Sequence, residues 1–138
     1  MSRKFARTHA FKLIYQLNFN MENPDEIFDN YISRIKNFDE HEKIIIHDEF
    51  YGVYENLFYI DELISNNSKW SLSRLNKIDL SLIRLAIYEM LYEKNKPAIV
   101  INEVVDLANE YGTDASTGFV NGILAKISSD INSGVLNE

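Results

Sequence analysis

The sequence predicts an all-α protein of about seven helices arranged in two small helical bundles. Long segments repeat their apolar residues with the 3.6-residue period of an amphipathic helix. Only 5 Gly and 2 Pro occur in 138 residues, too few for the many tight turns of a β-sandwich or a β-barrel. Hydrophobic residues make up 46% of the chain, which is enough to build the core of one ordinary domain.

Three helices are expected in the first half. The first runs from about Arg3 to Asn20, and the second opens at Pro24, because proline suits the first turn of a helix. A third, long helix follows the break at Asn37 to Asp39 and continues to about Ile64. Each has one apolar stripe. The stripes are Ala6, Ala10, Leu13, Ile14 and Leu17; then Phe28, Tyr31, Ile32 and Ile35; then Ile46, Phe50, Val53, Leu57, Ile60 and Ile64.

The turn-favouring residues Asn66 to Ser68 mark an internal boundary, which predicts an N-terminal helical subdomain of residues 1–67 and a C-terminal one of residues 68–138. A short helical turn is expected at Ser71 to Leu75. The following segment, Ile78 to Tyr92, is apolar almost all the way round, which is typical of a helix in the middle of a bundle.

Two further helices complete the second half. Pro97 opens one of them and Gly112 has the position of its C-cap, while the last helix starts near Asp114 or Ser116. Their expected core residues are Val100, Val104, Leu107 and Ala108, then Val120, Ile123, Leu124, Ile127 and Ile131.

The charge balance excludes a uniformly basic surface that would coat nucleic acid. Lys and Arg total 14 against 21 Asp and Glu, for a net charge of −7. Binding to an anionic membrane surface is disfavoured for the same reason. No segment approaches the ~18 consecutive apolar residues of a membrane span, and the N-terminus has no secretory signal. A cytoplasmic protein without a membrane partner is therefore expected.

No arrangement suited to catalysis or to metal binding is visible. The chain has no cysteine, no nucleophile elbow and no glycine-rich phosphate loop. Its histidines, His9, His41 and His47, do not form a pair of ligands one helical turn apart. The adjacent acids Asp48-Glu49 and Asp61-Glu62 point about 100° apart on a helix and are expected on solvated faces. We therefore expect no enzyme, no cofactor, no metal and no small-molecule substrate.

Charge is distributed unevenly along the chain. The first 21 residues hold four basic side chains, Arg3, Lys4, Arg7 and Lys12, and no acid. The other 117 residues hold 10 basic and 21 acidic side chains, a net charge of −11. Arg3 and Arg7 are one helical turn apart, and aromatic residues lie close by in the sequence. Cations beside rings are typical of single-stranded RNA binding, although short basic tracts are also common without that function.

A second candidate site lies at the start of the last helix, where Phe119 is displaced from the core direction to the rim. Free backbone N–H groups of the first turn, together with Ser116, could bind a phosphate, and Gly118 would let a chain approach closely. The plainer alternative is that Ser116 or Asp114 only caps the helix while Phe119 packs on a neighbour.

Four blocks in order resemble the NusB family of bacterial transcription antitermination factors, and the resemblance covers nearly the whole chain. They are AR-x-x-A-x-x-x-x-Y-Q at Ala6–Gln16, IRLAIYE at Ile83–Glu89, Pro97 followed by INEVVDLA at Ile101–Ala108, and FVNGIL at Phe119–Leu124. The family fold, two small helical bundles, agrees with the pattern described above.

The resemblance implies a non-enzymatic RNA-binding adaptor. Such proteins pair with NusE, a small-subunit ribosomal protein, and the pair binds the single-stranded boxA element of nascent RNA, which helps the RNA polymerase antitermination complex read through terminators, notably in ribosomal RNA synthesis. Two sets of functional residues follow by position. The RNA-binding set is Arg3, Lys4, Arg7, Ser116 and Phe119; the NusE-binding set is Asp79, Arg84 and Tyr88.

Alternatives remain beside this interpretation. Arg84 and Glu89 could instead be satisfied polar groups of a nearly buried helix. The family often has arginine where this chain has Phe5, and lysine where it has Gly118, which predicts weaker RNA binding without a partner. Three phosphate contacts would give a salt dependence with a log–log slope of about −2. A purely protein-binding adaptor that has lost RNA contact, and a self-associating dimer, both stay open.

Overall fold

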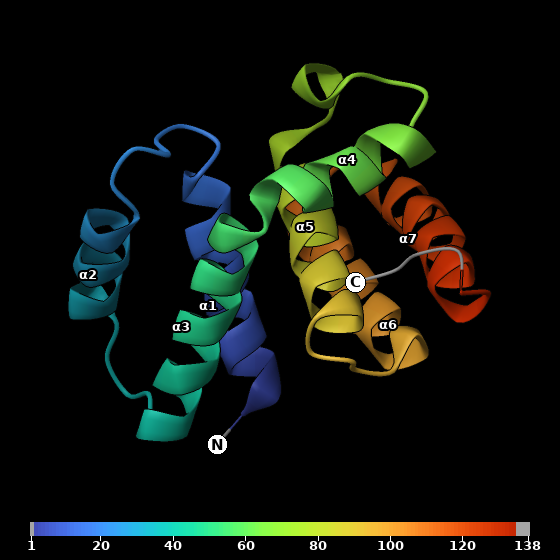
Figure 1. The fold of residues 1–138 in the computed structure, drawn as a ribbon. Helices are drawn as coiled ribbons and strands as arrows, with labels where there is room; N and C mark the ends of the chain where they lie inside the picture. The colour runs from blue at the N-terminus through green and yellow to red at the C-terminus, as the bar shows by residue number, and fades with distance from the viewer. Residues whose placement is uncertain (1, 135–138) are drawn as a thin grey trace. The chain divides into compact units, whose positions relative to one another are not determined.

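The structure is a computed structural model and describes residues 2–134. The all-α prediction is confirmed, because this part of the chain contains helices and no β-strand (Figure 1). The elements are α1 (Arg3–Gln16), α2 (Pro24–Arg34), α3 (Glu40–Glu55), α4 (Leu57–Asn67), the 3₁₀ turn η1 (Leu72–Arg74), α5 (Lys77–Leu91), α6 (Pro97–Tyr111) and α7 (Ser116–Asn132).

The chain divides into two compact units, one up to Asn56 and the other from Leu57 onward. The division therefore falls at Asn56, earlier than the boundary expected at residues 67 and 68. The long helix predicted to reach Ile64 is two helices. Asn56 ends α3, since its side-chain amide donates to the Gly52 carbonyl at 2.8 Å and competes with continuation of the helix.

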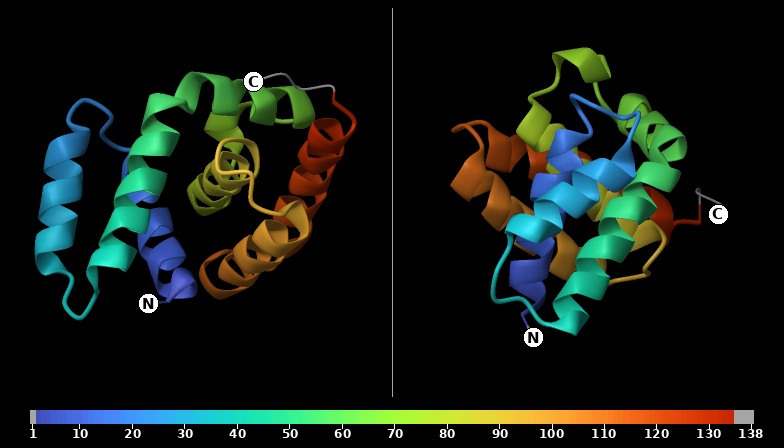
Figure 2. Two further views of the ribbon diagram at one scale, coloured as in Figure 1. Left: turned by 60° about the horizontal axis from the view of Figure 1, so that its bottom comes forward. Right: turned by 90° about the vertical axis from the view of Figure 1, so that its left-hand side faces the viewer.

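The first unit is a three-helix bundle in which α1 lies beside α3 and α2 contacts both (Figures 1 and 2). Local signals set each helix start. Ser2 caps α1, Asn23 caps α2 ahead of Pro24, and Asp39 forms a capping box with Glu42 at α3. All the predicted stripe residues of α1 are buried. In α2 the prediction was partly wrong, because Ile27 and Phe28 form the buried face while the later stripe residues are half-buried.

The second unit is built around α5, which contacts α4, α6 and α7, while α6 and α7 pack on each other (Figure 2). The prediction of a central helix is confirmed, since nearly every α5 residue from Asp79 to Leu91 is buried. The predicted stripes of α6 and α7 are buried as well, except for Ile131, which is half-buried. Gly112 ends α6 as expected, with its N–H bonded to the Ala108 carbonyl.

Candidate nucleic-acid interface

The three predicted N-terminal cations share the first turns of α1 and differ in their exposure. Lys4 is exposed. The Arg3 guanidinium is one-third exposed and forms an ion pair with the buried carboxylate of Glu49, with 2.7 Å between Nη2 and Oε2. Arg7 is buried, with 5% of its surface exposed. In this conformation Lys4 is therefore the member of the set whose charge is most available to a phosphate.

Ser116 and Phe119 occupy the first turn of α7, and the structure places them in different environments. Ser116 is fully buried, and its hydroxyl accepts a hydrogen bond from the Thr113 N–H at 2.9 Å. A Cβ at Gly112 would lie 2.4 Å from the Ser116 Oγ, so only glycine fits beside this hydroxyl. Phe119 is half-buried. The geometry gives Ser116 the task of shaping the turn before α7, and direct contact of its hydroxyl with RNA stays a prediction.

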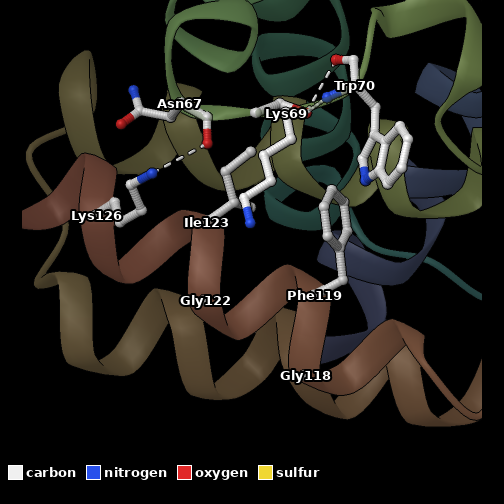
Figure 3. Close-up of a pocket in the computed structure, with 9 residues that line it drawn as sticks. Asn67, Lys69, Trp70, Gly118, Phe119, Gly122, Ile123 and Lys126 are labelled. Atoms are coloured by element: carbon white, nitrogen blue, oxygen red, sulfur yellow. Dashed lines mark hydrogen bonds between the residues drawn. The ribbon is translucent and has the colours of Figure 1, made fainter.

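An open hollow of about 280 Å³ lies next to Phe119, and we call it the Trp70 groove. One side is α7 and the other is the segment that follows α4 (Figure 3). Its lining residues are Asn67, Ser68, Lys69, Trp70, Gly118, Phe119, Gly122, Ile123 and Lys126.

No role was predicted for Trp70 from the sequence, so its place in the groove was missed. The indole is 51% exposed, and the Arg74 guanidinium carbon lies 5.2 Å from the ring centroid, within the range of a cation–π contact. The signal that could have found it is the spacing of Trp70, the one tryptophan of the chain, four residues before an arginine.

Asp79, predicted to bind a protein partner, lies in the first turn of α5 and is buried. Within residues 2–134 its Oδ1 has no hydrogen-bond partner. Burial raises the pKa of the Asp79 carboxyl, and a hydrogen bond with Ser116 acts in the opposite direction. The structure thus brings together Asp79 and Ser116, which the sequence assigned to two separate sites.

Arg84 and Tyr88 lie further along α5. Arg84 is 6% exposed and makes a two-point ion pair with Asp61 of α4, with 2.8 Å from Nε to Oδ1 and 2.9 Å from Nη2 to Oδ2. The prediction of a solvated face was wrong for Asp61, because this pair withdraws its carboxylate from water. Tyr88 is half-buried and stacks on Tyr92, with ring centroids 5.6 Å apart.

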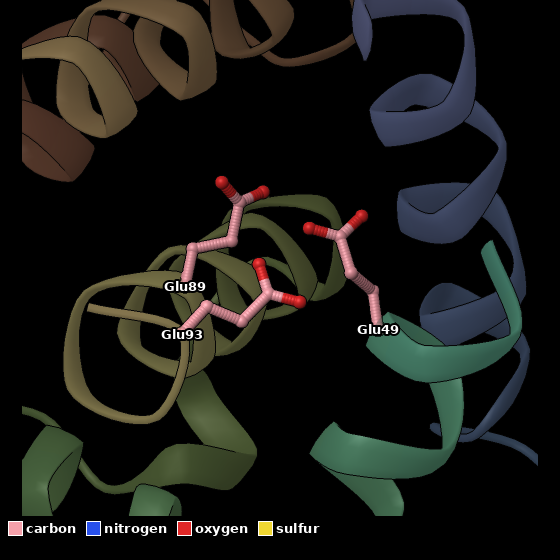
Figure 4. Close-up of side chains that lie close together, drawn as sticks. All are labelled: Glu49, Glu89 and Glu93. Atoms are coloured by element: carbon pink, nitrogen blue, oxygen red, sulfur yellow. The ribbon is translucent and has the colours of Figure 1, made fainter. Parts of the chain in front are cut away.

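Two further glutamates, Glu49 of α3 and Glu89 of α5, are fully buried, and Figure 4 draws their side chains. Glu49 of α3 accepts from Arg3, which makes the expectation of a solvated face wrong for this residue too. Glu89 of α5 accepts from the Asn95 side chain at 3.1 Å, in keeping with the alternative of a satisfied polar group on a buried helix. Each carboxylate thus accepts a hydrogen bond from a side chain of its own unit.

The chain matches the NusB family model over residues 4–129. It is 40% identical to the transcription antitermination protein NusB of Acetivibrio thermocellus, with 92% of this chain and 88% of the relative covered. Its identity to the Bacillus velezensis protein of the same name is 34%, covering 96% of this chain and all of the relative.

Solved structures agree with this relationship. NusB from T. maritima superposes with a TM-score of 0.84 at 34% identity, covering 94% of this chain and 92% of that one. A chain from a crystal structure of the antitermination factors NusB and NusE with double-stranded RNA gives a TM-score of 0.85 at 27% identity, covering 92% and 96%. Among residues 2–134, no helix combines the length and apolar character that crossing a membrane requires. The resemblance expected from four sequence blocks is confirmed, and the chain belongs to the NusB family.

Proposed function

We propose that this chain is a transcription antitermination factor, a non-enzymatic adaptor that binds boxA-type single-stranded RNA together with NusE. The observation that carries the proposal is the position of Phe119, half-buried at the start of α7 and open to the Trp70 groove. Family membership over residues 4–129 supports the same function. The adaptor would act in the cytoplasm, where RNA polymerase transcribes ribosomal RNA.

The RNA surface in this proposal combines a small number of charges with aromatic rings. Lys4 supplies an exposed charge at α1, and Arg3 adds a charge already shared with Glu49. Phe119 supplies a ring on which a splayed base can stack. Few cationic contacts give weak binding at cellular salt, so the proposal requires NusE to supply part of the affinity.

The NusE surface is proposed to include Tyr88, whose ring is partly accessible beside Tyr92. Both Asp79 and Arg84 are buried. Arg84 supports this surface by joining α5 to Asp61 of α4, and Asp79 supports it through its hydrogen bond with Ser116 of α7. Their substitution is then expected to act on the folding of the second unit as well as on NusE.

One observation favours the second candidate, an adaptor that binds protein partners without touching RNA. Two of the three predicted N-terminal cations are committed inside the protein, Arg3 to Glu49 and Arg7 by burial. If Lys4 alone contributes a phosphate contact there, the N-terminal share of the salt slope falls to about −0.7.

The test is a titration of fluorescein-labelled boxA RNA with this protein, with and without NusE, followed by anisotropy. A scrambled RNA of equal length and a double-stranded boxA RNA are the controls. Binding that requires NusE and prefers single-stranded boxA supports the proposal. NusE binding without any RNA binding would instead support the protein-only adaptor, and equal binding of all three RNAs would refute boxA recognition.

A further inference from the structure

The Trp70 groove supports an inference about a binding site. Trp70 itself was not among the RNA-binding residues predicted from the sequence. The groove measures about 280 Å³, just below the ~300–1,000 Å³ of sites for drug-sized ligands. It has room for one planar ring system. Its two aromatic residues come from different segments, Trp70 from the loop after α4 and Phe119 from α7, and the Phe119 side chain extends from α7 toward the indole (Figure 3).

The charge of the lining differs from that of the chain. The net charge of the protein is −7, yet among the residues that the structure describes the lining contains Lys69 and Lys126 and no carboxylate. The Nζ of Lys126 donates to the Asn67 carbonyl at 3.4 Å. Arg74 adds a further cation beside the indole. Such a lining favours a negatively charged ligand over an uncharged, apolar ligand.

Two glycines of α7 provide an independent observation. Gly118 and Gly122 are one turn apart and line the groove. Apart from the backbone of α7 itself, no atom of the described residues lies within 4 Å of a Cβ built at either position. Packing within the chain therefore does not require glycine, although glycine in a helix costs about 0.5–1 kcal/mol relative to alanine. A ligand that approaches the backbone of α7 closely would account for glycine at both Gly118 and Gly122.

We propose that the Trp70 groove holds one nucleotide of the bound single-stranded RNA, with its base against Trp70 and Phe119 and its phosphate near Lys69 and Lys126. Rings flanked by cations are how proteins bind single strands, because each base has a stacking face and each linkage a phosphate. This inference rests on the proposed function, and it extends the proposed RNA-binding surface from Phe119 into the groove. The competing occupant, a segment of a protein partner, is separated from it by the experiment.

Trp70 is the one tryptophan of the chain, so its fluorescence reports on the groove directly. Titration with boxA RNA in the presence of NusE is expected to quench it, and the same titration of Trp70→Phe supplies the background. RNA anisotropy measured in parallel gives the affinity independently. Trp70→Ala is expected to weaken RNA binding about 5- to 150-fold, with Trp70→Phe retaining most of it. Lys69→Ala and Lys126→Ala should each reduce the salt slope by about 0.7.

Gly118→Ala and Gly122→Ala complete the design, because a purely structural role and a ligand role predict different outcomes. Each is expected to raise the melting temperature while weakening RNA binding several-fold. Phe58→Ala, which removes an 82% exposed ring from α4, is the matched control and should leave RNA binding unchanged. Circular dichroism verifies the fold of each variant.

The outcomes separate the two proposals. RNA binding with unchanged Trp70 fluorescence and an unaffected Trp70→Ala variant would overturn the groove inference and leave boxA binding intact. If Trp70→Ala binds NusE more weakly than the unaltered protein when no RNA is present, the groove belongs to a protein partner. That result would also overturn the groove inference. Absence of RNA binding by the unaltered protein with NusE would refute the proposed function itself.

Discussion

The guanidinium of Arg84 and the carboxylate of Asp61 form two parallel hydrogen bonds, 2.8 and 2.9 Å long, that join α5 to α4. The side chains are 8% and 20% exposed, so the pair is largely removed from water. A planar guanidinium matches a carboxylate at two points, which fixes direction as well as distance. The pair is therefore a structural link of the second unit, whatever its part in binding NusE.

Removal of one partner from this pair should destabilise the protein. Arg84→Ala leaves the Asp61 charge without its partner and is expected to lower the free energy of unfolding by about 3 kcal/mol. Asp61→Asn removes the charge of the other partner. Urea denaturation of the two single variants and the double variant completes a double-mutant cycle, which gives the coupling energy of the pair. A coupling energy near zero, with NusE affinity lost in a fully stable Arg84→Ala variant, would show that Arg84 acts in binding alone.

Lys4 and Arg7 should give opposite results although both were predicted to contact RNA. Lys4→Ala removes an exposed charge, so stability should change by no more than about 0.5 kcal/mol while the salt slope of RNA binding falls by about 0.7. Arg7→Ala empties a buried position and is expected to cost more than about 1 kcal/mol of stability. Thermal melts and RNA titrations at several salt concentrations check both. A stable Arg7→Ala variant with a reduced salt slope would contradict this division.

Asp79 predicts a pH dependence of stability. Its pKa is raised from 3.8 in the folded protein, chiefly by burial, so the folded state holds the proton more tightly than the unfolded state. The resulting stabilisation is present below pH 3.8 and is lost as the pH rises through the folded pKa. Asp79→Asn, which stays neutral, should melt at a higher temperature than the unaltered protein at pH 7. The difference should vanish in acid, and a less stable variant at pH 7 would show that the ionised carboxylate is needed.

Phe119→Ala should weaken RNA binding by about 1–3 kcal/mol, the usual worth of one base stacked on an aromatic ring. Because Phe119 is only half-buried, the fold should survive its loss. Anisotropy with labelled boxA RNA and NusE measures the affinity, and a thermal melt measures stability. A large fall in melting temperature without a specific loss of RNA affinity would identify Phe119 as a core residue.

Most of the helices could be predicted from the sequence because they combine apolar periodicity with a start or end signal. Pro24 and Pro97 each stand at the first residue of a helix, and α5 has apolar residues almost all the way round. The break at Asn56 could not be seen in the same way. Val53, Leu57 and Ile60 keep the helical spacing across it, and a local side-chain hydrogen bond, which periodicity does not record, ends α3.

The site was predicted less completely than the fold, because burial of polar groups depends on tertiary neighbours. Arg7 shares a helical face with Phe11 and Ile14, at spacings of four and seven, and this pattern could have indicated its burial. The pairing of Arg84 with Asp61, 23 residues apart, has no local signal. The Trp70 groove likewise joins segments far apart in the sequence, so composition and motif spacing could not reveal it.

The division at Asn56 also bears on how the protein is made. Each unit is one continuous stretch of chain, so the partners within each core are close together in the sequence. Low separation between contacting residues favours fast folding, and domains generally fold N-terminal first during synthesis. The bundle of α1, α2 and α3 can therefore assemble at the ribosome while the helices from α4 onward are still being translated.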